Sequence, residues 1–196
     1  MIFGRSFGSY RCRETAYWRI GMNNNDILIR LRYALDIRDI DMIEIFKLGG
    51  ITVTKEELLR MLLNPKKGSN LDLDDEEFIA NDDMKKCNYY MFESFLNGFI
   101  IFKRGKQESE SGQPVKPIFM IKDNKEVNNV MLKKVKIALS LTGEDMLEIF
   151  KTAGVELSKG ELTAVLRKEG QRNYKECGDR YARNFLKGLA IRYRNK

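Results

Sequence analysis

The residues that could do chemistry in this chain are carboxylates, thiols and a run of cations, because the sequence contains no histidine. Without imidazole, Ser-His-Asp and Cys-His catalysis and histidine-containing zinc or iron sites are excluded. The phosphate-binding loop patterns GxxxxGK(S/T) and GxGxxG are absent as well. These exclusions predict a protein that needs no cofactor, and they favour a binding function over an enzymatic one.

Two pairs of carboxylates occur with a spacing of three residues: Asp41 with Glu44, and Asp145 with Glu148. A pseudo-twofold axis could bring all four together around Mg²⁺ or Mn²⁺, which prefer oxygen ligands. Acidic residues in a first helical turn are also favoured by the helix dipole, and Asp145 fits a helix cap. We therefore predict no metal site, with a carboxylate-metal enzyme as the alternative.

The cysteines are Cys12, Cys87 and Cys177, and none of them forms a CxxC motif. Neither a disulfide framework nor a zinc ribbon is indicated, and a reducing cytoplasm fits best. Cys87 and Cys177 occupy equivalent places in a repeat and are expected to be small buried packing residues. Lys175 and Arg180 could lower the pKa of the Cys177 thiol, which would matter only if the sulfur were exposed.

The C-terminal segment carries the functional lead. The whole chain has a net charge of +7, and residues 166–196 alone contain ten Lys/Arg against three Asp/Glu. Such a basic segment predicts an anionic partner, with nucleic acid as the first candidate. The cations expected to contact phosphates are Arg172, Lys175, Arg183, Lys187, Arg192 and Arg194. Tyr174, Tyr181 and Tyr193 lie among them and could stack on bases.

Two other interpretations of the basic segment stay open. It could be a solvated helix face without a partner. It could also belong to a protein-protein interaction module. In such a module the acidic insertion of one molecule, or another acidic protein, docks on the basic end, or a partner fills a groove between the repeats. An exposed apolar groove would favour such a module, whereas a continuous positive strip with exposed tyrosines would favour nucleic acid.

An internal duplication supplies the elements that position these residues. DMIEIFK at 41–47 recurs as DMLEIFK at 145–151, and the same offset of 104 aligns 31–35 with 135–139. Further along the chain the offset falls to 90, which aligns Cys87 with Cys177, so the first copy holds 14 extra residues. A duplication of this length predicts two copies of one structural unit.

Each copy is expected to contain four helices, because apolar residues recur at helical spacing and no segment alternates with a period of two. Asn25 and Asn129 are expected to be N-caps of the first helices. Capping boxes at 54–57 and 158–161 begin the third helices. The predicted fold is therefore all-α, with two pseudo-symmetric four-helix repeats packed together.

The last helix of each copy contains an interior glycine, Gly98 or Gly188. An interior glycine costs about 1 kcal/mol relative to alanine. We therefore expect a close helix approach at these glycines, at the interface between the copies.

The chain divides into four parts on these patterns. They are an N-terminal extension at 1–21, a first repeat at 22–104 with an acidic insertion at 64–83, a linker at 105–124, and a second repeat at 125–196 with a basic C-terminal helix. The extension matches nothing in the second copy, and translation is expected to start at Met22. No apolar run approaches the ~18 residues that would span a bilayer.

From Met22 onward the chain resembles the YehS-like proteins, a bacterial family built from two copies of a domain of unknown function. The resemblance rests on NNDIL at 24–28, LRYAL at 31–35, the two heptads, NYKECGD at 173–179 and NFLKGL at 184–189. It implies a small cytoplasmic bacterial protein with tandem repeats. It implies no activity.

Overall fold

The computed structural model describes residues 22–63, 84–106 and 117–194, which form eight α-helices and no strand. The helices are α1 (Asn24–Leu35), α2 (Asp39–Leu48), α3 (Lys55–Leu62), α4 (Tyr89–Arg104), α5 (Asn124–Ala138), α6 (Gly143–Thr152), α7 (Lys159–Leu166) and α8 (Asp179–Arg194). The predicted all-α fold is confirmed. The N-terminal extension and the acidic insertion lie outside the described residues. None of the described helices is long and apolar enough to cross a membrane.

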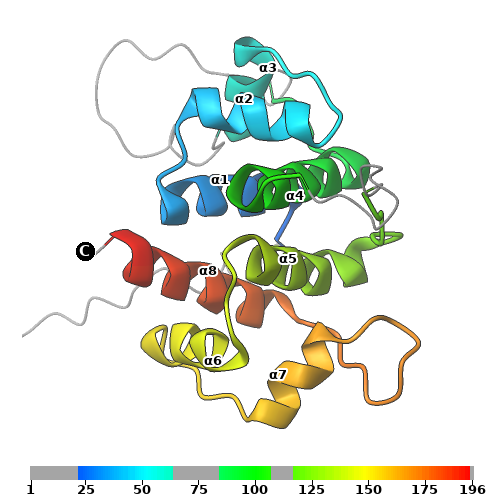
Figure 1. Cartoon of the computed structure of the whole chain (residues 1–196), viewed down its shortest axis with the longest axis vertical. Helices are drawn as coiled ribbons and strands as arrows, with labels where there is room; N and C mark the ends of the chain where they lie inside the picture. Colours follow the sequence, from blue (N-terminus) through cyan, green and yellow to red (C-terminus); the bar gives the residue numbers. More distant parts are fainter. Residues whose placement is uncertain (1–21, 64–83, 107–116, 195–196) are drawn as a thin grey trace, which may run out of the picture.

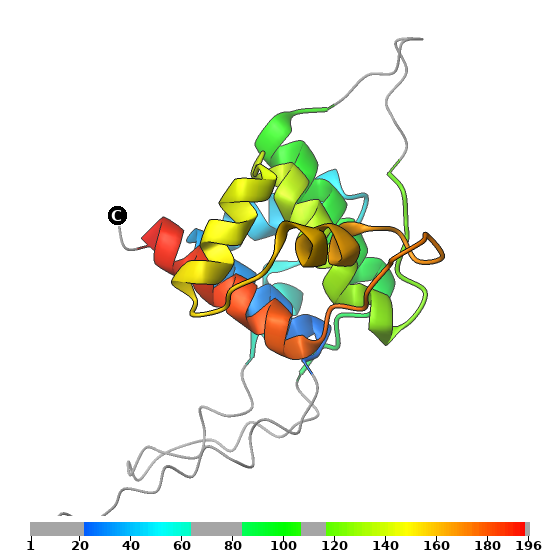
Figure 2. The same ribbon diagram turned by 90° about the horizontal axis from the view of Figure 1, so that it is seen from below.

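The helices form four levels (Figure 1). Helices α1 and α4 make one central layer and α5 and α8 the other, while α2 with α3 and α6 with α7 cover the outer sides. Across the middle, α1 packs against α8 and α4 against α5, and both views show α1 beside α8 (Figure 2). The first helix of each copy therefore packs on the last helix of the other copy.

The starts of α3 and α7 follow the predicted capping chemistry, and α6 begins with a capping box of the same kind. Thr54, Thr142 and Ser158 each accept a hydrogen bond from the backbone N–H three residues ahead, and the acidic side chain at that position accepts one from the cap's own N–H. These reciprocal bonds satisfy two backbone donors that the helix itself leaves open. The capping boxes therefore fix where α3, α6 and α7 begin.

The prediction that Asn25 and Asn129 are N-caps is wrong. Asn23 and Asp123 cap α1 and α5. Asn25 is buried and its amide donates to the carbonyls of Met61 and Lys85 at 2.8 and 2.9 Å, while its oxygen accepts from the Cys87 N–H at 3.0 Å.

The second copy repeats this arrangement. The Asn129 amide donates to the carbonyls of Val165 and Lys175 at 2.8 and 2.9 Å, and its oxygen accepts from the Cys177 N–H at 2.9 Å. Each asparagine thus joins the first helix to the end of the third helix and to the segment before the last helix. Buried amides with all these partners are structural, because losing any partner would leave a polar group unsatisfied.

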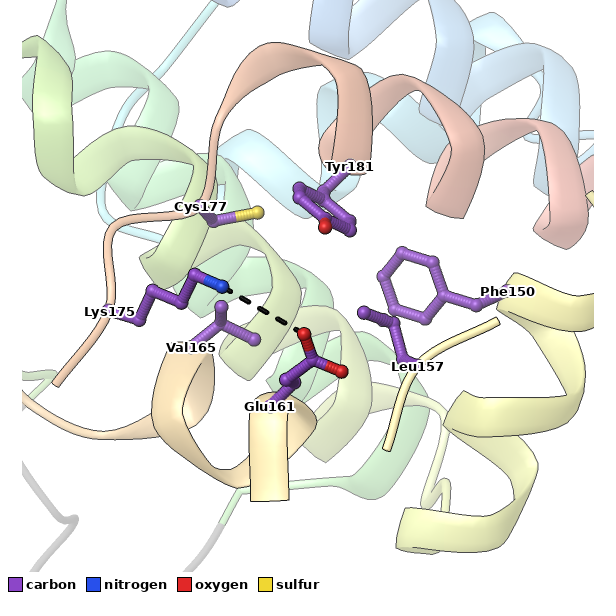
Figure 3. Close-up of a pocket in the computed structure, with 7 residues that line it drawn as sticks. All are labelled: Phe150, Leu157, Glu161, Val165, Lys175, Cys177 and Tyr181. Carbon is purple, nitrogen blue, oxygen red and sulfur yellow. Dashed lines mark ion pairs between the residues drawn. The ribbon is translucent and has the colours of Figure 1, made fainter. Parts of the chain in front are cut away.

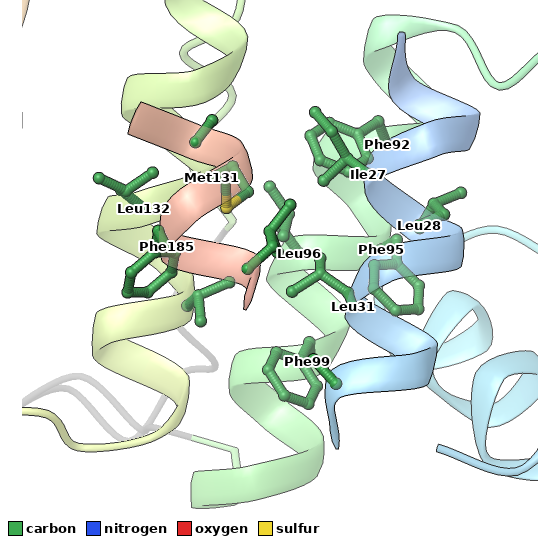
Figure 4. Packing of buried hydrophobic residues seen from close by; sticks show 14 of the residues in the cluster. Ile27, Leu28, Leu31, Phe92, Phe95, Leu96, Phe99, Met131, Leu132 and Phe185 are labelled. Carbon is green, nitrogen blue, oxygen red and sulfur yellow. The ribbon is translucent and has the colours of Figure 1, made fainter. Parts of the chain in front are cut away.

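A single apolar core joins the two copies. Figure 4 shows side chains from all four central helices, among them Leu31, Leu96 and Met131, meeting between the copies. Every residue of 92–99 in α4 is buried, and so is every residue of 126–132 in α5. These stretches of the two helices are covered on all sides, whereas α1 and α8 keep one exposed side.

The interior glycines allow close helix approach, but inside each copy and not between the copies as expected. A Cβ on Gly98 would lie 1.8 Å from the carbonyl oxygen of Ile45 in α2, and one on Gly188 would lie 2.0 Å from that of Ile149 in α6. Real Cβ atoms cannot approach so closely. The glycines therefore let the last helix of each copy rest on the backbone of the second helix.

Replacing Gly98 by alanine should lower the free energy of unfolding by about 2–3 kcal/mol, since α2 and α4 would have to separate. Gly160→Ala is the matched control, because its Cβ would meet nothing closer than 3.9 Å in α7; it should raise stability by up to about 0.5 kcal/mol. Urea unfolding followed by circular dichroism measures both. If the urea midpoints of both variants moved by the same amount in the same direction, the close contact between Gly98 and α2 would be refuted.

Candidate functional site

The six cations predicted to contact phosphates lie in two places. Arg172 and Lys175 lie on the loop between α7 and α8, and the other four lie on α8. At 3.6 residues per turn, Arg183, Lys187 and Arg194 share one side of that helix, and Arg192 points elsewhere. The structure therefore does not bring all six together.

Arg192 is bound within the protein. Its guanidinium donates to Asp145 Oδ1 at 2.7 Å and lies 3.6 Å from Glu148 Oε2, so it ties α8 to α6. The pKa of Asp145 is lowered chiefly by the Thr142 hydroxyl and N–H and then by Arg192. The pKa of Arg192 is raised by the hydrogen bond to Asp145. This pair holds the second copy together and leaves little of Arg192 for a ligand.

Three of the other predicted cations lie near carboxylates of the same chain. Lys175 Nζ is 3.9 Å from Glu161, Arg183 is 4.0 Å from Asp179, and Arg194 is 3.4 Å from Asp36. Ion pairs of this length at the surface contribute about 0–1 kcal/mol. A phosphate could therefore compete with these carboxylates for the three cations. The remaining two predicted cations, Arg172 and Lys187, are exposed.

We call Arg180, Arg183, Lys187 and Arg194 the α8 basic face. They recur along one side of the helix, and all but the half-buried Arg183 are exposed. Helix α1 lies alongside and adds the exposed Arg30 and Tyr33, whose ring lies 4.1 Å from the Arg194 guanidinium. Our sequence analysis missed Arg30 and Tyr33, because only the fold brings the start of the first copy beside the C-terminal helix.

The tyrosines predicted to stack on bases do not line this face. Tyr181 points into a small apolar pocket beside Phe150 (Figure 3), and Tyr193 is packed against the core. Tyr174 is half-buried on the loop before α8. Tyr33, by contrast, is 62% exposed. The aromatic ring next to the cations thus comes from α1.

The contact between α4 and α5 contains a buried ion pair that our sequence analysis did not anticipate. Lys134 Nζ donates to Glu93 Oε1 at 2.7 Å, to Asn97 Oδ1 and to the Ile118 carbonyl at 2.8 Å. The side chains of Lys134 and Glu93 are only 6% and 1% exposed. Burial lowers the pKa of Lys134, and the hydrogen bond to Glu93 opposes that shift.

A strap of residues 118–121, from the predicted linker, closes over this pair. The Met120 and Ile121 N–H groups donate to the two Glu93 oxygens at 2.7 and 2.8 Å. The Glu93 carboxylate is thereby held by Lys134 and two backbone donors. The sequence signal was the spacing of Glu93 and Asn97, which lie one turn apart in a mostly apolar helix.

The repeated cysteines are packing residues, as predicted. Cys87 and Cys177 are each 1% exposed, and burial raises the pKa of both thiols to about 12. The pocket beside Cys177 has a volume of about 10 Å³, the room of a single water molecule (Figure 3). Neither thiol is therefore poised as a nucleophile.

The four repeated carboxylates do not converge. Helices α2 and α6 lie on opposite outer sides of the molecule (Figure 1). Asp41 binds Arg38 at 2.8 Å, while Asp145 binds Thr142 and Arg192. In the part of the chain that the structure describes, no three Asp, Glu, Cys or His side chains are grouped to hold a metal ion.

Comparison with known proteins gives a family without an assigned activity. A family model described as "Protein of unknown function (DUF1456)" matches residues 24–105 and 128–195. The chain is 36% identical to the "Uncharacterized protein YehS" of Escherichia coli (strain K12) over 172 residues, which cover 87% of this chain and 96% of that protein. No solved structure matches.

Replacing Glu93 by glutamine keeps the shape of the side chain and leaves the Lys134 charge buried without an anion. We expect the free energy of unfolding to fall by about 3–5 kcal/mol in urea titrations. Glu144→Gln is the control, because its pair with Lys159 at 3.2 Å is 81% and 79% exposed; it should cost less than about 0.5 kcal/mol. Similar losses in the two variants would contradict the role of the buried pair.

Proposed function

The chain belongs to the DUF1456 family of proteins of unknown function, and we propose that it is a non-enzymatic protein that binds nucleic acid on the α8 basic face. The observation that carries the proposal is the regular placement of Arg180, Arg183, Lys187 and Arg194 along one side of α8. Buried thiols and separated carboxylates support a binding role over catalysis.

The length of the face suits a polyanion. Arg180 and Arg194 are separated by about 21 Å along the helix at 1.5 Å per residue, which is the axial rise of about six base pairs in duplex DNA. Cations held along a rigid helix meet successive phosphates without a large cost in ordering. This is the arrangement expected of backbone contacts, which supply affinity and no sequence preference.

Two features set the strength of the interaction. Tyr33 offers one exposed ring next to Arg194, and stacking on a base would add about 1–3 kcal/mol. Asp36 and Asp179 lie close to the cations and reduce the net charge of the face. We therefore infer modest affinity, steeply dependent on salt and greater for single strands, whose bases can reach the ring.

A protein-interaction module is the second candidate, on a different surface. The Phe119 ring of the strap stacks on Tyr90 of α4 with centroids 5.0 Å apart, and both side chains are exposed together with Ile118. Exposed apolar clusters of this kind are common at protein interfaces. Substitutions at Tyr90 and Phe119 would abolish such an interaction without changing nucleic-acid binding.

Fluorescence anisotropy with a labelled single strand of about 20 nucleotides tests the proposal. The affinity should fall between about 50 and 200 mM salt with a log–log slope of about −2 to −3.5, as for three to five phosphate contacts. Arg180→Glu with Lys187→Glu should weaken binding at least about tenfold.

The control for this variant is Lys47→Glu with Lys151→Glu, which changes the net charge equally on the exposed outer helices α2 and α6. It should keep most of the affinity. Equal losses in both variants, or no binding at low salt, would refute the proposed function.

A further inference from the structure

The strap is hydrogen-bonded to α4 and α5 through its backbone. The Met120 and Ile121 N–H groups donate to the two Glu93 oxygens at 2.7 and 2.8 Å, and the Ile118 carbonyl accepts from Lys134 Nζ at 2.8 Å. The strap is neither helix nor strand, and it runs along the outside of the helices before α5 begins (Figure 2). Contacts of this kind recognise the main chain, which every extended peptide carries.

The side chains of the strap are only partly buried. Ile118 is 69% exposed and Phe119 is 43% exposed, while Met120 and Ile121 are half-buried against the core. The Phe119 ring stacks on Tyr90 of α4. A segment with few buried apolar contacts opens at a lower free energy than the core helices. We therefore expect the strap to detach without unfolding of α4 and α5.

The groups beneath the strap form a polar site. Glu93, Lys134 and Asn97 are each at most 7% exposed. The carboxylate accepts from two successive N–H groups, and the ammonium donates to a carbonyl. A further donor is available, because Asn97 Nδ2 is buried and has no hydrogen-bond partner among the described residues. A buried donor without an acceptor costs free energy, so a ligand that supplied a carbonyl to it would bind more tightly than the strap does.

Packing of the two copies does not require these polar groups. The repeat equivalents of Glu93 and Asn97, at an offset of 90, are Arg183 and Lys187 on α8, where α8 packs against α1. That contact forms without a carboxylate or an amide at these two places. The polar set beneath the strap is therefore matched to the strap and not to the architecture of the repeats.

We propose that the contact between α4 and α5, which we call the α4/α5 seam, is a binding site for an extended peptide segment of another protein, and that the strap is an internal ligand of this site. The strap defines the chemistry of the partner. An aromatic residue would stack on Tyr90, and the two aliphatic residues after it would donate their N–H groups to Glu93. Proline is excluded at both aliphatic positions, because it has no N–H.

The internal ligand sets the affinity that a partner needs. A tethered segment acts at an effective concentration on the order of millimolar, and the partner binds only the fraction of molecules in which the strap is open. A partner must therefore gain a contact that the strap lacks, and Asn97 Nδ2 offers one.

This proposal goes beyond the proposed function, since it concerns the opposite seam and does not depend on nucleic-acid binding. It also differs from the second candidate function. There the partner docks on the outer side of Phe119 and Tyr90, whereas here the partner takes the place of Phe119.

The probe for the test is a peptide with the sequence of residues 117–123, PIFMIKD, blocked at both ends and labelled for fluorescence anisotropy. Met120→Pro with Ile121→Pro removes both N–H donors from the strap and leaves α4 and α5 unchanged. The peptide should bind this variant at least about tenfold more tightly than the original protein. At about 1 mM it should raise the melting temperature of the variant by about 2–4 °C. Equal affinity for the two proteins would refute the strap as an internal ligand.

The matched control is the same peptide methylated on the backbone nitrogens that correspond to Met120 and Ile121. It keeps the side chains and loses the two donors, so it should bind the variant at least about tenfold more weakly. Equal binding of the two peptides would contradict recognition through Glu93.

Phe119→Ala serves as a second variant if circular dichroism shows that the double proline variant does not fold. Phe119 is exposed, and loss of its stacking on Tyr90 loosens the strap while Glu93 and Lys134 stay in place. The peptide should bind this variant at least about threefold more tightly than the original protein. Failure of the peptide to bind either variant would overturn the proposal. The oligonucleotide should bind all these proteins equally, because α8 is unchanged, so the two proposals can fail separately.

Discussion

The structure depends on one constraint: neither copy can bury its first and last helices without the other. Helix α1 rests on α8 and α4 on α5, so the apolar faces of all four central helices meet across the middle of the molecule. Burial of apolar surface is the main source of stability, at roughly 25 cal/mol per Å². The duplication is therefore more than two linked domains, because the central part of the core lies between the copies.

Because the first helix of each copy packs on the last helix of the other, the copies meet along two equivalent contacts, the α4/α5 seam and the α1/α8 seam. These two seams differ in charge and in exposure to solvent. The α4/α5 seam contains the buried Glu93–Lys134 pair and is covered by the strap of residues 118–121, and residues 92–99 and 126–132 of the two helices are buried. The α1/α8 seam keeps an exposed side with Arg30, Tyr33 and the α8 basic face. Both seams bury apolar side chains, and the α1/α8 seam in addition exposes cations along one side.

Much of the fold could be predicted from the sequence, because helical periodicity and capping boxes are local signals that two copies report independently. Thr54 and Ser158 are examples. The predictions that were wrong depended on the tertiary structure. Asn25 was predicted to cap a helix, but its buried amide hydrogen-bonds to two other segments of the same copy. Gly98 was predicted to contact the other copy, but it packs against α2 of its own copy. For the site, the sequence indicated the cations of α8. It could not indicate that Arg192 is bound to Asp145, or that Arg30 and Tyr33 lie alongside.

Native-state hydrogen exchange at increasing urea concentration, read by mass spectrometry, tests the shared core most directly. If the four central helices form one cooperative unit, the slowest amides of α1, α4, α5 and α8 should all exchange with the free energy of global unfolding. If α1 and α4 instead open at a clearly lower free energy than α5 and α8, or the reverse, each copy would be stable by itself and the account of a core made between the copies would be wrong.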